Sequence, residues 1–291
     1  MLTSPFVDQY RAARYSPKYL AQLVLILACC IWQVVLSAPL EVRDTNNLST
    51  LSDDQVTELR MWAQYAFAAY QDVTDWKCER CQGQTANTQF VGVYENIFPA
   101  MKWYLAVHKD RKTIILGCRG STEKNILTFL TDSTVSKEMW PPAAGDSEVH
   151  KGFLDSTQVG MGKVRDALKS LVEEYPDFTI TLTGHSLGGA QAVVAAVQLA
   201  MENSQWKSKL RVFTFGEPRV GNTEFAQYYD SQGIPTRRVV NHNDLVPHFP
   251  PHAMDFTHHG GEVWIRSSDN QGVACPAVYP DENDDCSSGV R

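Results

Sequence analysis

The sequence has no excess of basic residues and no low-complexity region, and each absence excludes a class of protein. Lysine and arginine number 26 against 33 aspartates and glutamates, so the formal net charge is −7. Without a cationic surface to bind phosphates, we expect no nucleic-acid partner. With 43% hydrophobic and 20% charged residues, the composition also excludes a disordered, collagen-like or coiled-coil chain. A chain of 291 residues can bury a core without metal or disulfide cross-links.

The first residues have the pattern of a secretory signal peptide. Arg11, Arg14 and Lys18 precede an apolar run over 23–32, and small residues precede a cleavage position after Ser37. We expect residues 1–37 to be removed and the product to be secreted. An uncleaved anchor is the alternative, although the apolar stretch over 20–36 is shorter than the roughly 20 residues that span a bilayer. Residues 38–51 are polar and aperiodic, and we interpret them as a linker or short pro-segment.

Cysteines are few, and their spacing agrees with an oxidising compartment. Beyond the signal peptide the chain keeps Cys78, Cys81, Cys118, Cys275 and Cys286. The first two form a C-x-x-C pattern, but no second such pattern or spaced histidine pair accompanies them, so we favour a local disulfide over a redox or zinc site. The last two bracket an acidic turn and make a second predicted bridge. One thiol then stays free, and no metal is expected.

Hydrophobic periodicity predicts an α/β fold. After Ser52 the apolar residues recur at helical spacing as far as Tyr70, and two β-rich runs over 101–108 and 113–118 read as a hairpin. Helices over 153–174, 187–201 and 222–232 then alternate with strands over 178–183, 210–215 and 236–241. Such alternation indicates a mostly parallel sheet covered by helices on both faces. We assign residues 52–291 to one domain.

A G-x-S-x-G motif centred on Ser186 follows one of these strands and opens an almost wholly apolar helix. The motif alone is weak evidence for a catalytic serine, since a glycine-rich structural turn can have the same pattern. Its strand–turn–helix context favours a nucleophile elbow, in which a tight turn raises the serine hydroxyl at the end of a sheet. We therefore take Ser186 as the nucleophile. The neighbouring His185 is expected to be a packed side chain.

A serine hydroxyl needs a base to accept its proton and an acid to hold that base. In α/β-hydrolases the acid follows the serine in chain order, at the end of a later strand. Asp244 lies in the loop after the strand over 236–241 and is our candidate, ahead of Asp230 and Asp255. A turn-forming aspartate is the alternative interpretation.

Together with the Asp244 loop, the segments over 149–153, 183–190 and 215–222, the last reading F-G-E-P-R-V-G-N, make the chain resemble the secreted fungal class 3 lipases, a family of α/β-hydrolases that includes feruloyl esterases. The resemblance runs from about residue 52 to the C-terminus. It implies hydrolysis of acylglycerol esters at a lipid–water interface through an acyl-serine intermediate. It implies no cofactor and no stable protein partner.

The resemblance also assigns an oxyanion hole and a lid. Ser121 matches the family's R-G-S/T pattern, so its backbone N–H and hydroxyl would join the Leu187 N–H in binding the oxyanion. A helix N-cap is the alternative role for Ser121. Residues 122–131 match the lid, whose apolar face would comprise Ile126, Leu127, Phe129 and Leu130. Feruloyl esterases tend to have a more polar lid, so this segment favours a lipase; a feruloyl or acetyl esterase acting on plant polysaccharide is the alternative.

The sequence departs from the family pattern at the histidine that acts as general base. The family carries its histidine beyond the last disulfide in an H-x-x-Y-F setting, which this sequence does not contain. His259 qualifies by chain order alone, although its segment does not normally supply the base; His248 and His252 read as loop residues. We expect a truncated sequence whose base lies past Arg291. The alternatives are a catalytically impaired hydrolase and a lipid-binding relative.

Overall fold

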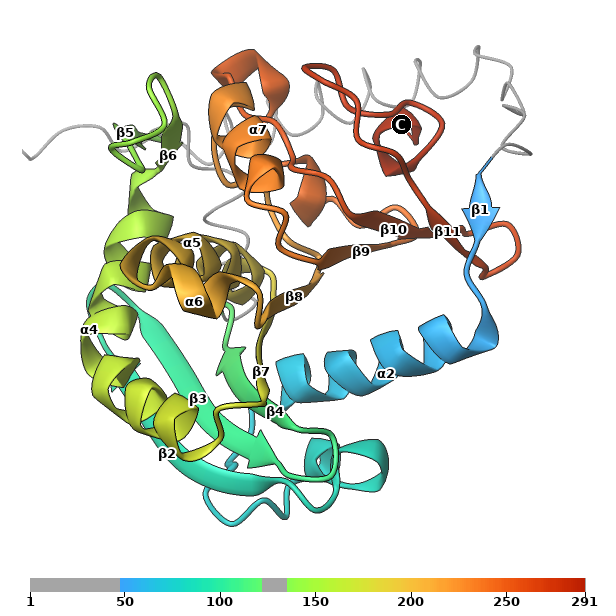
Figure 1. The fold of residues 1–291 in the computed structure, drawn as a ribbon. Coiled ribbons are helices and arrows are strands. Elements are labelled where there is room, and N and C mark those ends of the chain that lie inside the picture. Colours follow the sequence, from blue (N-terminus) through green and yellow to red (C-terminus); the bar gives the residue numbers. More distant parts are fainter. Residues whose placement is uncertain (1–47, 122–134, 291) are drawn as a thin grey trace, which may run out of the picture. The chain divides into compact units, whose positions relative to one another are not determined.

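A nine-stranded sheet organises the fold in the computed structural model, which describes residues 48–121 and 135–290 (Figure 1). The predicted signal peptide, residues 1–37, and the predicted lid, residues 122–131, lie outside the described residues. The strand order is β1-β11-β10-β9-β8-β7-β4-β3-β2. The strands are β1 Ser49–Thr50, β2 Gln89–Asn96, β3 Met101–His108, β4 Thr113–Cys118, β7 Thr179–His185, β8 Leu210–Phe215, β9 Thr236–Asn241, β10 Glu262–Ile265 and β11 Gly272–Ala274. A separate two-stranded ribbon pairs β5 Lys137–Met139 with β6 Glu148–His150.

The five strands from β4 to β10 run parallel, and antiparallel strands extend the sheet at both edges. The α-helices among the described residues are α2 Asp53–Ala68, α4 Lys151–Glu174, α5 Leu187–Glu202, the short α6 Ser204–Lys207 and α7 Thr223–Ser231. None of these helices is both long and apolar enough to cross a bilayer. The α/β-hydrolase fold class is confirmed.

The core has two halves because the central strands are apolar on both faces. In β3, Trp103, Leu105 and Val107 join a cluster with α4, α5 and α7, whereas Tyr104 and Ala106 face a second cluster built on α2. Strands buried on both sides read as continuous apolar runs, and β3 does so. In Figure 1, α4 and α5 lie side by side, and α2 lies apart from them beside β7 and β8.

The helix boundaries follow from capping signals in the sequence. At the start of α2 the Ser52 hydroxyl accepts a hydrogen bond from the backbone N–H of Gln55, and the Gln55 side chain accepts one from the Ser52 N–H. This capping box satisfies two N–H groups that lack a partner within the helix. The strands over 210–215 and 236–241 have the predicted bounds.

Other strands are absent from the prediction. Ser49 and Thr50, within the segment interpreted as a linker, pair with Val273 and Ala274 as an edge strand. A strand of two residues leaves no periodic pattern in the sequence, and β11 is almost as short. β2 is longer, but its exposed and half-buried positions give it little apolar signal.

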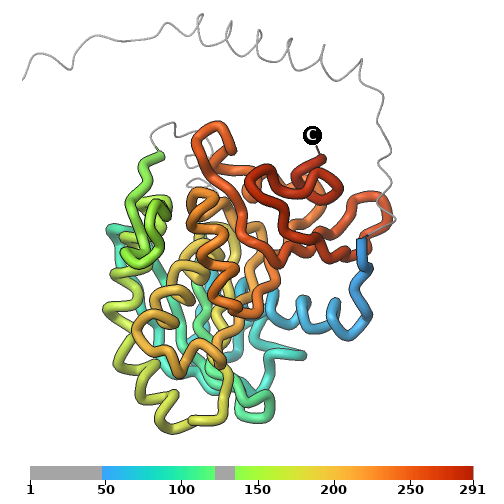
Figure 2. The backbone as a smooth tube through the Cα atoms, turned by 45° about the horizontal axis from the view of Figure 1, so that its top comes forward, coloured from blue at the N-terminus to red at the C-terminus, as the bar shows by residue number. Residues whose placement is uncertain are grey.

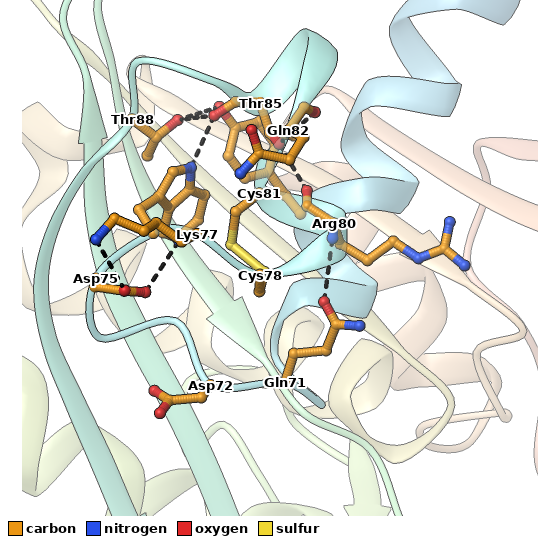
Figure 3. Close-up of a disulfide and its surroundings, with 12 residues drawn as sticks. Gln71, Asp72, Asp75, Lys77, Cys78, Arg80, Cys81, Gln82, Thr85 and Thr88 are labelled. Atoms are coloured by element: carbon orange, nitrogen blue, oxygen red, sulfur yellow. Dashed lines mark hydrogen bonds and ion pairs between the residues drawn. A yellow bond between two sulfur atoms is a disulfide. The ribbon is translucent and has the colours of Figure 1, made fainter.

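The structure joins both predicted cysteine pairs. Cys78 is bonded to Cys81 and Cys275 to Cys286. Figure 3 shows the first bridge within a short turn, where the Arg80 N–H donates to the Gln71 side chain and the hydroxyl of Thr85 donates to the Arg80 carbonyl. Cys118 is a free, buried thiol, and burial raises its pKa well above the usual value.

Two glycines of α4 give a matched test of packing between α4 and the sheet. A methyl group at Gly160 would lie 2.6 Å from the buried ring of Trp103, whereas one at Gly162 would contact nothing within 4 Å. We expect Gly160→Ala to lower the free energy of unfolding by about 1 to 3 kcal/mol through overpacking. Gly162→Ala should raise it by about 0.4 to 1 kcal/mol because alanine restricts the unfolded chain. Urea unfolding of both variants measures the difference, and equal effects would contradict this packing.

Candidate active site

Ser186 lies in a sharp turn between β7 and α5. Its backbone has φ 55° and ψ −130°, which side-chain-bearing residues rarely adopt. The Ser186 N–H donates to the carbonyl of Phe215 at the end of β8, 2.9 Å away, and this bond holds the turn against the sheet. The residue is 4% exposed. A strained serine at the carboxyl end of a parallel strand is the geometry of a nucleophile elbow.

Glycines surround the turn because no side chain fits there. A Cβ on Gly184 would lie 2.2 Å from the carbonyl oxygen of Gly188, and one on Gly188 would lie 2.1 Å from that of Cys118. Both distances are far below van der Waals contact. The two glycines of the motif therefore allow β7, α5 and the end of β4 to approach closely enough to form the turn.

The two predicted oxyanion-hole residues belong to segments that lie next to Ser186. Leu187 opens α5, where backbone N–H groups of the first turn have no partner four residues earlier. Ser121 directly follows Gly120, and a Cβ on Gly120 would lie 3.2 Å from the Cβ of Ser186. The loop after β4 thus passes beside the serine. The helix that would follow Ser121 if it were an N-cap lies outside the described residues.

Tyr70 holds this loop, a role that the sequence did not reveal. Its hydroxyl bonds to the backbone of Gly120 and lies 2.9 Å from Nδ1 of His185. Burial raises the pKa of Tyr70 to about 12, so the phenol stays protonated. The His185 ring also packs on Phe67 at 4.8 Å between centroids, as expected of a packed side chain. The only sequence signal was an aromatic residue at the end of the first helix.

Asp244 lies beside the elbow. Its Oδ1 accepts a hydrogen bond from the Val246 N–H at 3.0 Å, and its Oδ2 lies 2.8 Å from the place of a Cβ on Gly216. Gly216 follows β8 with φ +57°. Burial lowers the pKa of His185, and the charge of Asp244 acts on that ring in the opposite direction, which also reflects their proximity.

The competing aspartates have other partners. Asp230 accepts hydrogen bonds from the Gly260 N–H at 3.0 Å and from the hydroxyl of Tyr279. Asp255 pairs with Lys137 on the surface. Of these three aspartates, Asp244 is the one whose loop lies beside the elbow, so it remains the candidate for the acid.

His259 has both ring nitrogens engaged. Nε2 lies 2.9 Å from Oε1 of Glu217, and Nδ1 lies 2.8 Å from the carbonyl oxygen of Gly260. The side chain is 1% exposed, and its ring packs on Tyr229 at 4.4 Å between centroids. In this arrangement neither nitrogen is available to take a proton from Ser186. Chain order alone is therefore a poor guide to the base here.

The other C-terminal histidines lie in the loops that follow β9. His248 and His252 lie in the 3₁₀ turns Val246–His248 and His252–Met254, and His258 bonds to the carbonyl of Pro247. None of the hydrogen bonds described for residues 48–121 and 135–290 joins a histidine to Ser186 or Asp244.

The remaining predictions concern the lid and metals. Ile126, Leu127, Phe129 and Leu130 lie outside the described residues. Glu262, Cys275 and Cys286 bring three potential ligand atoms together, but both sulfur atoms belong to a disulfide and are not thiolate ligands.

Comparisons with known proteins agree with this geometry. The family described as Lipase (class 3) matches residues 115–254. A lipase from Rhizopus microsporus var. chinensis superposes with a TM-score of 0.79 at 30% identity, covering 87% of this chain and 88% of that one. Lipase II from Rhizopus niveus has a TM-score of 0.75 at 31% identity, covering 84% and 92%.

Sequence relatives give the same result. A lipase from Rhizomucor miehei is 37% identical over 221 residues, which cover 74% of this chain and 58% of the relative. The chain spans about three fifths of the length of the first curated relatives that it matches. The identity, the coverage of whole solved chains and the elbow geometry together show that this chain belongs to the class 3 lipase family.

Proposed function

We propose that the protein is a secreted lipase that hydrolyses carboxylic esters of acylglycerols through an acyl-serine intermediate on Ser186. The observation that carries the proposal is the strained turn at Ser186, with the Gly120 loop on one side and Asp244 on another. The relatives named above, which are lipases, support it. The disulfides and the N-terminal pattern support export to an oxidising compartment.

In this mechanism the Ser186 oxygen attacks the ester carbonyl and the oxyanion forms against the N–H groups of Leu187 and Ser121. Each such donor lowers the barrier by about 3 to 4 kcal/mol. Asp244 orients an imidazole that takes the serine proton and returns it to the leaving alcohol. We propose that this imidazole is not that of His259, because both of its ring nitrogens already bond to other groups. The segment over 122–131 would cover an acyl groove and open at a lipid surface.

Substrate preference tests the proposal against its alternatives. We expect hydrolysis of emulsified triolein to exceed hydrolysis of methyl ferulate, measured as released acid at equal enzyme concentration. A preference for methyl ferulate would favour the esterase interpretation. Absence of hydrolysis together with binding to triolein droplets would favour a lipid-binding relative.

Covalent labelling tests the nucleophile. A fluorophosphonate probe should label the full chain, and Ser186→Ala should abolish labelling because the motif over 184–188 contains no other hydroxyl group. Ser147→Ala is a control at a buried serine whose hydroxyl donates to the Trp140 carbonyl. Mass spectrometry of the labelled peptide reads the result; a label retained in Ser186→Ala contradicts the assignment.

The acid is tested by a substitution that preserves shape. Asp244→Asn should lower kcat for ester hydrolysis by about 10⁴-fold, since an amide favours the wrong imidazole tautomer. Asp255→Asn changes the same residue type in the surface pair with Lys137 and should leave kcat within a factor of about two. Steady-state kinetics on a soluble short-chain ester compare the two, and similar losses would remove Asp244 from the mechanism.

A further inference from the structure

A buried polar cluster lies behind the loop that carries Asp244. Arg219 makes a two-pronged ion pair with Glu282, with contacts of 2.8 and 2.9 Å, and Arg238 bonds to Glu262 at 2.8 Å. The Glu282 carboxylate also accepts the backbone N–H of His258. Figure 2 shows the segments that carry these residues, in orange and red, side by side at one end of the fold. The cluster therefore ties the C-terminal segment to the loops after β9.

Two side chains of this cluster have polar atoms without a protein partner among the described residues. They are Nε and Nη1 of Arg238 and Nδ1 of His258. Arg238 is 3% exposed and His258 is 5% exposed, so bulk water does not satisfy these atoms. A buried polar group without a partner costs about 1 to 3 kcal/mol, and more when it is charged. Both side chains line the same small cavity, of about 20 Å³.

The protonation of His258 follows from its other nitrogen. Nε2 lies 2.7 Å from the carbonyl oxygen of Pro247, which only accepts, so Nε2 carries the hydrogen. Burial, with the nearby Arg238 cation, lowers the pKa of His258 well below its usual value, so the ring is neutral. Nδ1 is then a bare lone pair that requires a donor. The unpartnered atoms of these two cavity-lining side chains are thus N–H donors on Arg238 and an acceptor on His258.

We propose that one water molecule is bound in this cavity, accepting a hydrogen bond from the Arg238 guanidinium and donating one to Nδ1 of His258. The bound water stabilises the tautomer that the Pro247 carbonyl selects, through which His258 acts as a positioning residue for the Asp244 loop. This second part rests on the function proposed above; the water site itself does not.

Water suits the cavity better than an ion does. A halide would accept from Arg238 but has no hydrogen to donate to Nδ1. A metal cation would face the guanidinium of Arg238, and the Glu262 and Glu282 carboxylates that line the cavity are already paired with Arg238 and Arg219. A cavity needs about 10 to 15 Å³ to hold one water molecule, and this one, at about 20 Å³, is large enough.

His258 reaches Asp244 through a single turn of chain. The Pro247 carbonyl that it holds belongs to the 3₁₀ turn Val246–His248, and the Val246 N–H donates to Oδ1 of Asp244 at 3.0 Å. Loss of the bond to Pro247 would remove one of the contacts that position this turn, which Arg219 also holds through the carbonyl of His248. A misplacement of about 1 Å at a catalytic group can cost about 100-fold in rate.

Two substitutions of His258 separate the water site from the positioning role. His258→Asn keeps an acceptor at the position of Nδ1 but loses the bond to Pro247. His258→Gln keeps a donor that reaches Pro247 but has no atom at the position of Nδ1. His108→Asn is the control, since His108 is also buried but lies at the opposite end of the sheet, where its Nδ1 accepts from the Arg111 N–H.

Crystal structures and labelling of Ser186 by a fluorophosphonate are the measurements. We expect the water in the wild type and in His258→Asn, and its loss in His258→Gln. In His258→Asn we expect the turn over 246–248 to shift and labelling to slow by about 10- to 100-fold. His258→Gln should slow labelling less, as a partial rescue, whereas His108→Asn should lower stability without slowing labelling.

Each part of the proposal has its own contrary result. A halide in the wild-type cavity, or a cavity without density, overturns the water site. An unshifted turn and undiminished labelling in His258→Asn overturn the positioning role. If the wild type is not labelled at all, the proposed hydrolase function fails, while the crystal structures still decide both the water and the position of the turn.

Discussion

The site depends on one backbone constraint, the positive φ of Ser186. A serine with φ 55° is stable only if its surroundings hold it there, and they do so from three sides. The Phe215 carbonyl accepts its N–H, Gly184 and Gly188 let the strand and helix meet, and the Gly120 loop lies against its Cβ. The strain is thus balanced by the parallel sheet and α5. A hydroxyl raised in this way lies at the carboxyl end of the parallel strands, where the loops after β4, β8 and β9 converge.

The two halves of the site are held by different kinds of interaction. The serine half rests on apolar packing, since α5 is buried along almost its whole length between the sheet and α4. The acid half rests on buried ion pairs, Arg219 with Glu282 and Arg238 with Glu262. Buried ion pairs add little net stability but penalise any arrangement that separates the partners. They therefore specify where the Asp244 loop and the C-terminal segment lie rather than how tightly the chain folds.

Local patterns account for what the sequence allowed us to predict. The elbow could be found because a strand, a glycine-rich turn and an apolar helix follow one another within a short stretch, and Asp244 because loops after parallel strands meet at one edge. The contacts of Tyr70 with Gly120 and His185 could not be found, since they join residues far apart in sequence. The pairing of Glu217 with His259 was hidden for the same reason. Short strands such as β1 also escaped, because two residues carry no periodicity.

His259 illustrates why chain order does not identify a base. The Gly260 carbonyl can only accept, so Nδ1 of His259 donates to it. Nε2 and the buried Glu217 carboxyl then share one proton across 2.9 Å, whichever of them carries it. A catalytic imidazole needs the opposite arrangement, with one nitrogen donating to the acid and the other left open toward the serine. Glu217 occupies the nitrogen that would have to be open, and its Cβ and Cγ pack under the first turn of α5 at Gly189. The pair therefore belongs to the support of the elbow, and the proton of Ser186 must leave by another route.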